Sequence, residues 1–206
     1  MQSTIKKYSA SWVKALAMAL AFLFVFSTML FPVKGETFAA DAVTVSDAAG
    51  FEAALKGASP ITINITGDFT ITSTTTISSD VNLTINGGGH TITQSGGAQT
   101  LHMTGTGTTV SINGLTIDGA GSKTTDAKGG SAIYVEGGAV TIENSVIKNC
   151  ETTASSSGGA VIQRGGTLNL TNCSFIGNKA VNYGGAISSE GAKVYATNCT
   201  FYNNSS

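Results

Sequence analysis

Three charged residues recur at one position of a repeated segment, and their types could support acid–base chemistry. Glu136, Arg164 and Glu190 each stand fifth, counted from the alanine that follows a glycine pair. Glycoside hydrolases use two carboxyl groups that flank the bound sugar, one of them as a general acid. An arginine between two carboxylates lowers their pKa values, however, which disables a general acid. We therefore interpret the three residues as an exposed ladder that fixes the register of the repeat or binds a ligand, and we assign no catalytic residue.

The three cysteines could form a disulfide, bind a metal ion or pack as small apolar side chains. Cys150, Cys173 and Cys199 are an odd number, which argues against a disulfide framework. No histidine lies near them in the sequence, so we predict neither a metal site nor a cofactor. Cys173 and Cys199 occupy matching octets, TNCSFIGN and TNCTFYNN, two residues before Phe175 and Phe201. We expect free thiols that point inward beside these phenylalanines, with a Cys173–Cys199 disulfide as the alternative.

The remaining candidates for chemistry give weaker signals. His90 follows three glycines at a bend and His102 lies in a Leu-His-Met segment, and we predict a structural or merely exposed role for both. Asp118 and Asp126 fall in a polar connection that could bind a cation. The glycine-rich calcium-binding nonapeptide of β-rolls is absent, so we assign no metal ligand there.

The segments that must position these residues form a repeat. Val110–Ile117, Val140–Ile147, Leu168–Phe175 and Val194–Phe201 align with 30, 28 and 26 positions between equivalent residues, and Leu83–Ile92 is a weaker relative. Apolar and polar residues alternate on either side of an Asn or Gly, which is the period of strands. Short strands in a repeat of this length are typical of parallel β-helix coils. We predict an all-β, right-handed parallel β-helix (solenoid) over residues 43–206.

The break inside each repeat falls on a residue that tolerates a left-handed backbone. Asn144, Asn172 and Asn198 are expected to stack at this bend and to hydrogen-bond from coil to coil. Phe175 and Phe201 are expected to stack inside the coils. A glycine pair in three of the repeats predicts a second turn, ahead of another short strand.

Residues 1–42 have the features of a signal peptide. Three lysines precede an uncharged apolar run, Ala15–Phe31, and Ala40-Asp41-Ala42 fits a cleavage signal. The run is near the lower limit for spanning a bilayer, so an uncleaved membrane anchor is the alternative. Both interpretations predict export, and therefore a secreted or cell-surface location.

A short amphipathic helix is predicted between the signal peptide and the first coil. Ser46 is the expected N-cap, acidic residues are expected in the first turn, Phe51 and Leu55 share one face, and Gly57 ends the segment. Such a helix would cover the open end of the first coil. No equivalent segment follows Phe201, so we expect the chain to be a fragment, or to rely on a partner. If no uncleaved signal segment holds the protein, we expect that attachment to a membrane would need a C-terminal anchor that this sequence lacks.

Composition limits the partners. The net charge is −1, only 11% of the 206 residues are charged, and no run of Lys or Arg is long enough to neutralise a series of phosphates. Nucleic acid is therefore excluded as an expected partner.

The glycine-pair element Gly-Gly-Ala-Ile/Val, followed by Phe-x-x-Asn at Phe175–Asn178 and Phe201–Asn204, resembles the paired repeat motifs of the polymorphic outer membrane proteins and of related adhesin-like proteins. The exported part as a whole resembles the pectin-lyase-like right-handed β-helix superfamily. The circuit that begins at Gly129 departs from the motif, because it ends in Ile147-x-x-Cys150. The resemblance implies the fold more than an activity.

The sequence thus favours an exported β-helix that serves as an adhesin-like structural or binding scaffold without catalysis in this segment. The superfamily resemblance implies carbohydrate as a partner, and a host or cell-surface protein is the other candidate. A polysaccharide lyase or glycoside hydrolase that acts on acidic polysaccharide is the alternative function.

Overall fold

A computed structural model describes residues 42–77, 80–125, 129–153 and 158–206. Residues 1–41 of the interpreted signal peptide, with its apolar run Ala15–Phe31, and the loop residue Asp126 lie outside these ranges. Within the described ranges, no helix has the length and apolar character needed to cross a membrane.

The chain forms three parallel sheets of seven, six and five strands, plus one additional two-stranded pair. The seven-stranded sheet contains β1 (Val43–Val45), β2 (Ile61–Ile65), β5 (Asn82–Asn86), β8 (Thr109–Asn113), β12 (Ala139–Glu143), β16 (Thr167–Thr171) and β19 (Lys193–Thr197). The six-stranded sheet contains β3 (Phe69–Ile71), β6 (Thr91–Gln94), β9 (Thr116–Asp118), β13 (Val146–Lys148), β17 (Ser174–Ile176) and β20 (Thr200–Tyr202). The five-stranded sheet contains β4 (Thr75–Ile77), β7 (Leu101–Met103), β11 (Ile133–Val135), β15 (Val161–Gln163) and β18 (Ile187–Ser189), and the pair joins β10 (Lys123–Thr124) to β14 (Glu151–Thr152).

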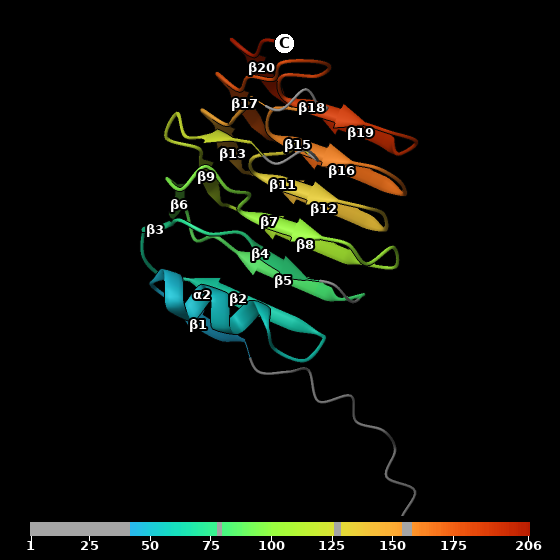
Figure 1. The fold of residues 1–206 in the computed structure, drawn as a ribbon. Helices are drawn as coiled ribbons and strands as arrows, with labels where there is room; N and C mark the ends of the chain where they lie inside the picture. The colour runs from blue at the N-terminus through green and yellow to red at the C-terminus, as the bar shows by residue number, and fades with distance from the viewer. Residues whose placement is uncertain (1–41, 78–79, 126–128, 154–157) are drawn as a thin grey trace, which may run out of the picture. The chain divides into compact units, whose positions relative to one another are not determined.

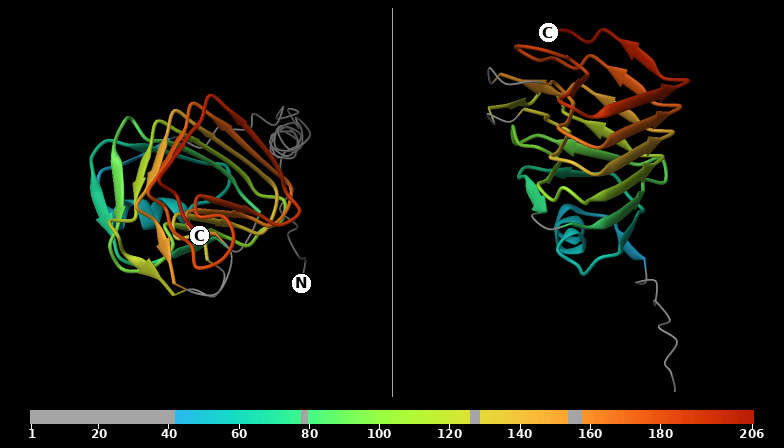
Figure 2. Two further views of the ribbon diagram at one scale, coloured as in Figure 1. Left: turned by 90° about the horizontal axis from the view of Figure 1, so that it is seen from above. Right: turned by 90° about the vertical axis from the view of Figure 1, so that its right-hand side faces the viewer.

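From β2 onward, successive strands along the chain belong to different sheets, and every strand pairs with its counterpart one circuit away. The chain passes from the seven-stranded to the six-stranded to the five-stranded sheet and then returns to the first (Figures 1 and 2). All strand pairings between circuits are parallel. The prediction of an all-β parallel solenoid with one short helix is confirmed, with about five turns.

The core lies inside the coils because alternate residues of each strand point inward. Val140 pairs in register with Val110 on one side and Leu168 on the other, and all three are at most 1% exposed. Burial of each such side chain contributes about 1.5–3 kcal/mol. In-register stacking of like on like therefore holds the coils together.

A column of asparagines marks the bend between the seven-stranded and six-stranded sheets. Asn144, Asn172 and Asn198 have φ angles of 49°, 55° and 53°, in the left-handed region that asparagine tolerates. Asn198 Nδ2 donates to Asn172 Oδ1 over 2.7 Å, and Asn172 Nδ2 donates to Asn144 Oδ1 over 3.0 Å. Asn144 Nδ2 continues the series to Asn113 Oδ1 over 2.9 Å. The hydrogen bonds thus run across four coils.

The asparagine of each Phe-x-x-Asn motif fastens one coil to the one before it. Asn178 is fully buried, its Nδ2 donates to the Ile147 carbonyl over 3.0 Å, and its Oδ1 accepts from the Cys150 amide over 3.0 Å. Asn204 Nδ2 donates in the same way to the Phe175 carbonyl over 2.8 Å. The motif therefore ties backbone groups at the end of the six-stranded sheet to a side chain of the following coil.

The single described helix, α2 (Ala48–Leu55), precedes β2 and lies beside β1 and β2 (Figure 1). The prediction of Ser46 as N-cap was wrong: Asp47 is the N-cap, and its Oδ1 accepts from the Gly50 amide over 2.7 Å. The predicted acidic residues in the first turn are also absent, because the helix begins after Asp47. Phe51 and Leu55 are buried as expected, and the Phe51 ring lies 5.5 Å from that of Phe69.

The last coil has the orientation of the others but is less buried. Phe201 stacks on Phe175, yet Phe201 is 50% exposed while Phe175 is fully buried. Cys199 is only partly buried, in contrast to Cys173. The predicted stack of Phe175 and Phe201 is present and Cys199 packs against the core, but Phe201 and Cys199 are only partly enclosed, because β20 is an edge strand of its sheet.

Candidate functional site

The structure brings Glu136, Arg164 and Glu190 together as a column on three successive coils. They follow directly on Val135, Gln163 and Ser189, which are paired in register in the five-stranded sheet. Arg164 Nε lies 3.5 Å from Glu190 Oε2, an ion pair whose two side chains are 36% and 42% exposed. We call these three residues the Glu–Arg–Glu ladder. The ladder is less exposed than the sequence suggested, because Glu136 and Arg164 are half-buried.

Tyr134 anchors the other side of the ladder and was missed by the sequence analysis. It points away from the coil interior, since its neighbours Ile133 and Val135 belong to the apolar core, yet it is fully buried. Its hydroxyl donates to Glu136 Oε1 over 2.7 Å, and the Arg164 guanidinium lies 5.6 Å from its ring centre. Burial, and next the hydrogen bond to Glu136, raise the pKa of Tyr134. The phenol therefore stays protonated and acts as a donor.

His102 completes this group from the preceding coil. It pairs in register with Tyr134, and the two ring centres are 4.7 Å apart in an edge-on arrangement. His102 is only 9% exposed. The arrangement fits the structural role expected for this histidine.

A depression of about 380 Å³, which we call the Tyr183 depression, adjoins Glu190, the last residue of the ladder. Its lining residues are Tyr183, Ser188, Ser189 and Glu190. Tyr183 is 71% exposed and has a φ of 62°, which is rare for a bulky residue. The depression thus combines an exposed aromatic ring with two hydroxyls and a carboxylate.

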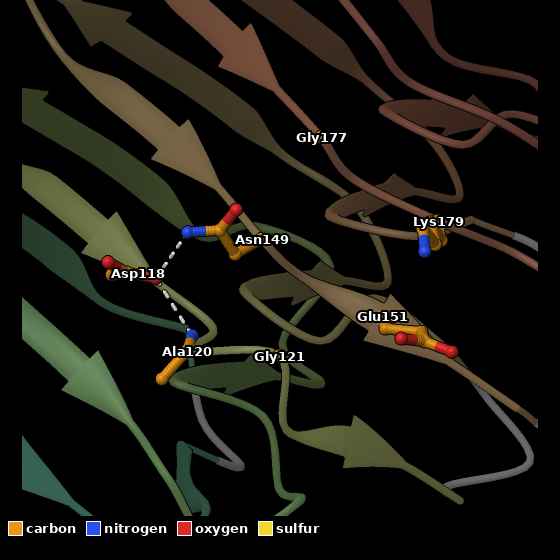
Figure 3. Close-up of a pocket in the computed structure, with 7 residues that line it drawn as sticks. All are labelled: Asp118, Ala120, Gly121, Asn149, Glu151, Gly177 and Lys179. Carbon is orange, nitrogen blue, oxygen red and sulfur yellow. Dashed lines mark hydrogen bonds between the residues drawn. The ribbon is translucent and has the colours of Figure 1, made fainter.

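A second depression, of about 440 Å³, lies where the chain leaves the six-stranded sheet. We call it the Asp118 depression, and it is lined by Asp118, Ala120, Gly121, Asn149, Glu151, Gly177 and Lys179. Figure 3 shows Asp118 and Asn149 on one side, and Glu151 and Lys179 on the other. These side chains come from three successive coils.

Asp118 is held as a carboxylate at the edge of this depression. Its Oδ1 accepts from Asn149 Nδ2 over 3.0 Å and from the Ala120 amide over 2.8 Å, and its Oδ2 lies 3.2 Å from Lys148 Nζ. Partial burial raises the pKa of Asp118, but the hydrogen bonds from Asn149 and Ala120 and the Lys148 ammonium together hold it below the ordinary value of 3.8. The sequence analysis identified Asp118 but not its partners.

A charged column lines the other side of the Asp118 depression. Glu151 pairs in register with Lys123 below it and Lys179 above it. Glu151 Oε1 lies 3.0 Å from Lys123 Nζ. Lys123, Glu151 and Lys179 are spaced 28 positions apart. An alignment of the repeats that includes the residues after the main strands therefore predicts that these three side chains stack.

The cysteines and the remaining histidine show no arrangement for catalysis or metal binding. All three cysteines are free thiols, and burial raises the pKa of Cys150 to about 12. His90 Nδ1 lies 3.1 Å from Asp68 Oδ1 at the surface. Across the described ranges, no three side chains of His, Cys, Asp or Glu are placed to hold a metal ion together.

Comparison with known protein families identifies the fold family of the solenoid. A family model described as a pectate lyase-like adhesive domain matches residues 42–206, which is the whole of the solenoid. Neither a curated protein nor a solved structure matches the chain. Because the matched region is well over half of the sequence, the chain belongs to the pectate lyase-like adhesive domain family.

Proposed function

We propose that this solenoid is the adhesive, non-catalytic part of an exported cell-surface protein. The family description as an adhesive domain supports adhesion. The apolar run Ala15–Phe31 after three lysines supports export through a signal peptide or an uncleaved anchor.

The ion pair inside the Glu–Arg–Glu ladder carries the non-catalytic part of the proposal. The guanidinium of Arg164 lies beside the Glu190 carboxylate, and Glu136 accepts from Tyr134. A general acid of a glycosidase needs a raised pKa, which an adjacent arginine opposes. The two carboxylates that most resemble a hydrolase pair are therefore engaged in structural contacts.

Carbohydrate is the partner that the Tyr183 depression fits best. An exposed aromatic ring stacks on the apolar face of a sugar, and serine hydroxyls and a carboxylate bind its hydroxyl groups. Tyr183, Ser188, Ser189 and Glu190 supply these groups side by side. A cell-surface protein is the alternative partner, and neither a cofactor nor nucleic acid is part of the proposal.

We also propose the handedness of the coils, the capping role of helix α2 and the type of repeat. The coils wind in a right-handed sense, as parallel crossover connections almost always do. The helix α2 covers the first coil, which its buried residues Phe51 and Leu55 support. The repeats are of the polymorphic outer membrane protein type, which the Asn178 and Asn204 contacts support, because they give the Phe-x-x-Asn motif a structural reason.

Two assays on the purified chain test this function. Polygalacturonate is incubated with the protein, with and without Ca²⁺, and unsaturated products and reducing ends are measured. Binding to immobilised polysaccharides and to cell-surface extracts is measured in parallel. We expect binding without cleavage.

Matched tyrosine variants locate the contact. Tyr183→Ala removes the ring from the depression, whereas Tyr195→Ala removes a 56% exposed ring from the outer face of β19. Binding to carbohydrate should fall in the first variant only. Cleavage of polygalacturonate that Glu190→Gln abolishes would overturn the non-catalytic proposal and favour a lyase or hydrolase.

A further inference from the structure

The Asp118 depression is lined by two carboxylates and one ammonium, and each carboxylate is paired with a lysine outside the lining. Asp118 is paired with Lys148 over 3.2 Å, and Glu151 is paired with Lys123 over 3.0 Å. The third lysine, Lys179, is exposed and lines the depression. In the part of the chain that the structure describes, no ion pair includes Lys179. Its ammonium group is therefore the charge available to a ligand.

Hydrogen-bonding groups stand beside this ammonium. Asn149 uses its Nδ2 on Asp118, while its Oδ1 faces Gly177 and lies 3.4 Å from the position that a Cβ on Gly177 would occupy. Glu151 uses Oε1 on Lys123, which leaves its second carboxylate oxygen as an acceptor. An amide oxygen and a carboxylate oxygen are acceptors for hydroxyl groups. The depression thus offers one cation next to acceptors that suit a polyol.

Two of the residues that line the depression, Gly121 and Gly177, carry no side chain. Gly121 and Gly177 have φ angles of 69° and 63°, and a Cβ on Gly121 would meet nothing within 4 Å. Ala120 and Asn149 are also left-handed, with φ angles of 50° and 54°. Left-handed residues other than glycine carry a conformational cost, and they concentrate at binding sites. Two such residues, Ala120 and Asn149, beside two left-handed glycines therefore point to a preserved shape.

We propose that the Asp118 depression binds an anionic, hydroxylated ligand: a sugar or polyol that carries one carboxylate or phosphate group. Lys179 pairs with the anionic group, and Asn149 and Glu151 accept hydrogen bonds from the hydroxyls. Asp118 acts as a positioning residue, because its contact with Asn149 Nδ2 turns the amide oxygen away from itself. The site shares no residue with the Tyr183 depression or the Glu–Arg–Glu ladder, so it does not depend on the function proposed above.

Nuclear magnetic resonance titration of the purified ¹⁵N-labelled chain tests this site with four probes. Glucose 6-phosphate and glucuronate carry both features of the proposed ligand. Glucose lacks the charge, and inorganic phosphate lacks the hydroxyls. We expect shifts of the Gly121, Gly177 and Lys179 amide signals with the two anionic sugars and weaker binding of both controls. The ratio of affinities for glucose 6-phosphate and glucuronate distinguishes a phosphate from a carboxylate ligand.

Two charge variants move the affinity in opposite directions. Lys179→Gln should weaken the anionic sugars about fivefold, the upper end for a solvent-exposed charge pair. Glu151→Gln should strengthen inorganic phosphate, because it removes a negative charge and releases Lys123. Lys193→Gln, at an exposed lysine in the seven-stranded sheet, is the matched control and should change nothing.

Three outcomes would overturn the proposal. Unchanged affinity of Lys179→Gln for the anionic sugars would show that the Lys179 ammonium does not bind the anionic group. Equal affinities for inorganic phosphate and glucose 6-phosphate would show that the site does not recognise hydroxyl groups. Absence of shifts at these amides with either anionic sugar would exclude the site. Native amide spectra of both variants establish that the coils are intact. The increase in phosphate affinity expected for Glu151→Gln is a test that does not depend on the Lys179 variant.

Discussion

Phe201 stacks on Phe175 with ring centres 5.1 Å apart and ring planes within 7° of parallel. The two phenylalanines are paired Cα to Cα in β20 and β17, so the stack reports the register of the coils directly. Their difference in exposure makes them a natural test of how much the interior contributes to stability.

Phe175→Ala should destabilise the solenoid much more than Phe201→Ala. Phe175 is fully buried, and a buried phenylalanine truncated to alanine costs about 3–5 kcal/mol. Phe201 is 50% exposed, so its truncation should cost less than about 2 kcal/mol. Urea unfolding followed by circular dichroism measures both. Equal losses would contradict the described burial.

Asn178→Ala should lower the free energy of unfolding by about 1–3 kcal/mol, because it removes the hydrogen bond to the Ile147 carbonyl and takes away the side-chain partner of the buried Cys150 amide. The same urea experiment gives this value. Asn169→Ala, on the outer face of β16, is the control for an asparagine within a strand and should be nearly neutral. A neutral result at Asn178 would show that the Phe-x-x-Asn motif does not fasten the coils.

Asn172→Ala and Asn172→Gly separate two contributions at the bend. Glycine keeps the left-handed backbone and loses the hydrogen bonds to Asn144 and Asn198, whereas alanine loses both. Alanine should therefore be the less stable variant by about 1–2 kcal/mol. Thermal unfolding of the two variants measures the difference. Identical melting temperatures would show that the φ of 55° imposes no strain.

Acid should destabilise the protein partly through Asp118. The folded-state pKa of this carboxyl group is lower than its ordinary value of 3.8, so its contribution is present above about pH 4 and is lost as pH falls through the folded pKa. Asp118→Asn should be less stable than the wild type at pH 7 and should lose less stability on acidification. Unfolding free energies measured from pH 7 down to pH 2 give both slopes. Parallel pH curves would contradict this role.

The thiols should differ in reactivity. Cys150 and Cys173 are buried, and burial raises the pKa of both, whereas Cys199 is partly exposed. A thiol reagent at pH 8 should modify Cys199 first in the native protein and all three thiols after unfolding.

Alkaline pH should destabilise the protein partly through Cys150. Because the folded pKa of Cys150 is about 12, compared with 9.0 ordinarily, its stabilising contribution is complete below pH 9 and declines as pH rises towards 12. Cys150→Ser should remove this alkaline loss, and fewer than three thiols in the unfolded chain would indicate a disulfide.

The limits of the sequence are clear at particular residues. The repeat alignment predicted that Glu136, Arg164 and Glu190 form one column, since the spacing of the circuits is visible in the sequence. It did not predict that Tyr134 is buried on the outer side of its strand, because alternation marks Tyr134 only as outward-facing. The helix was found, but its N-cap was misplaced by one residue, since Ser46 and Asp47 are both good caps and only the structure shows that Asp47 accepts from the Gly50 amide.

The sequence by itself determined the parallel solenoid, its bends at Asn144, Asn172 and Asn198, and the repeat that stacks equivalent residues, because these follow from local alternation and from residues that tolerate a left-handed backbone. Only the tertiary structure decided which side chains meet between the strands. The sequence spacing aligns Lys123, Glu151 and Lys179, but only the structure shows that Glu151 forms its ion pair with Lys123. Distances such as Asp118 to Lys148 likewise depend on side-chain packing across coils, which no local pattern encodes.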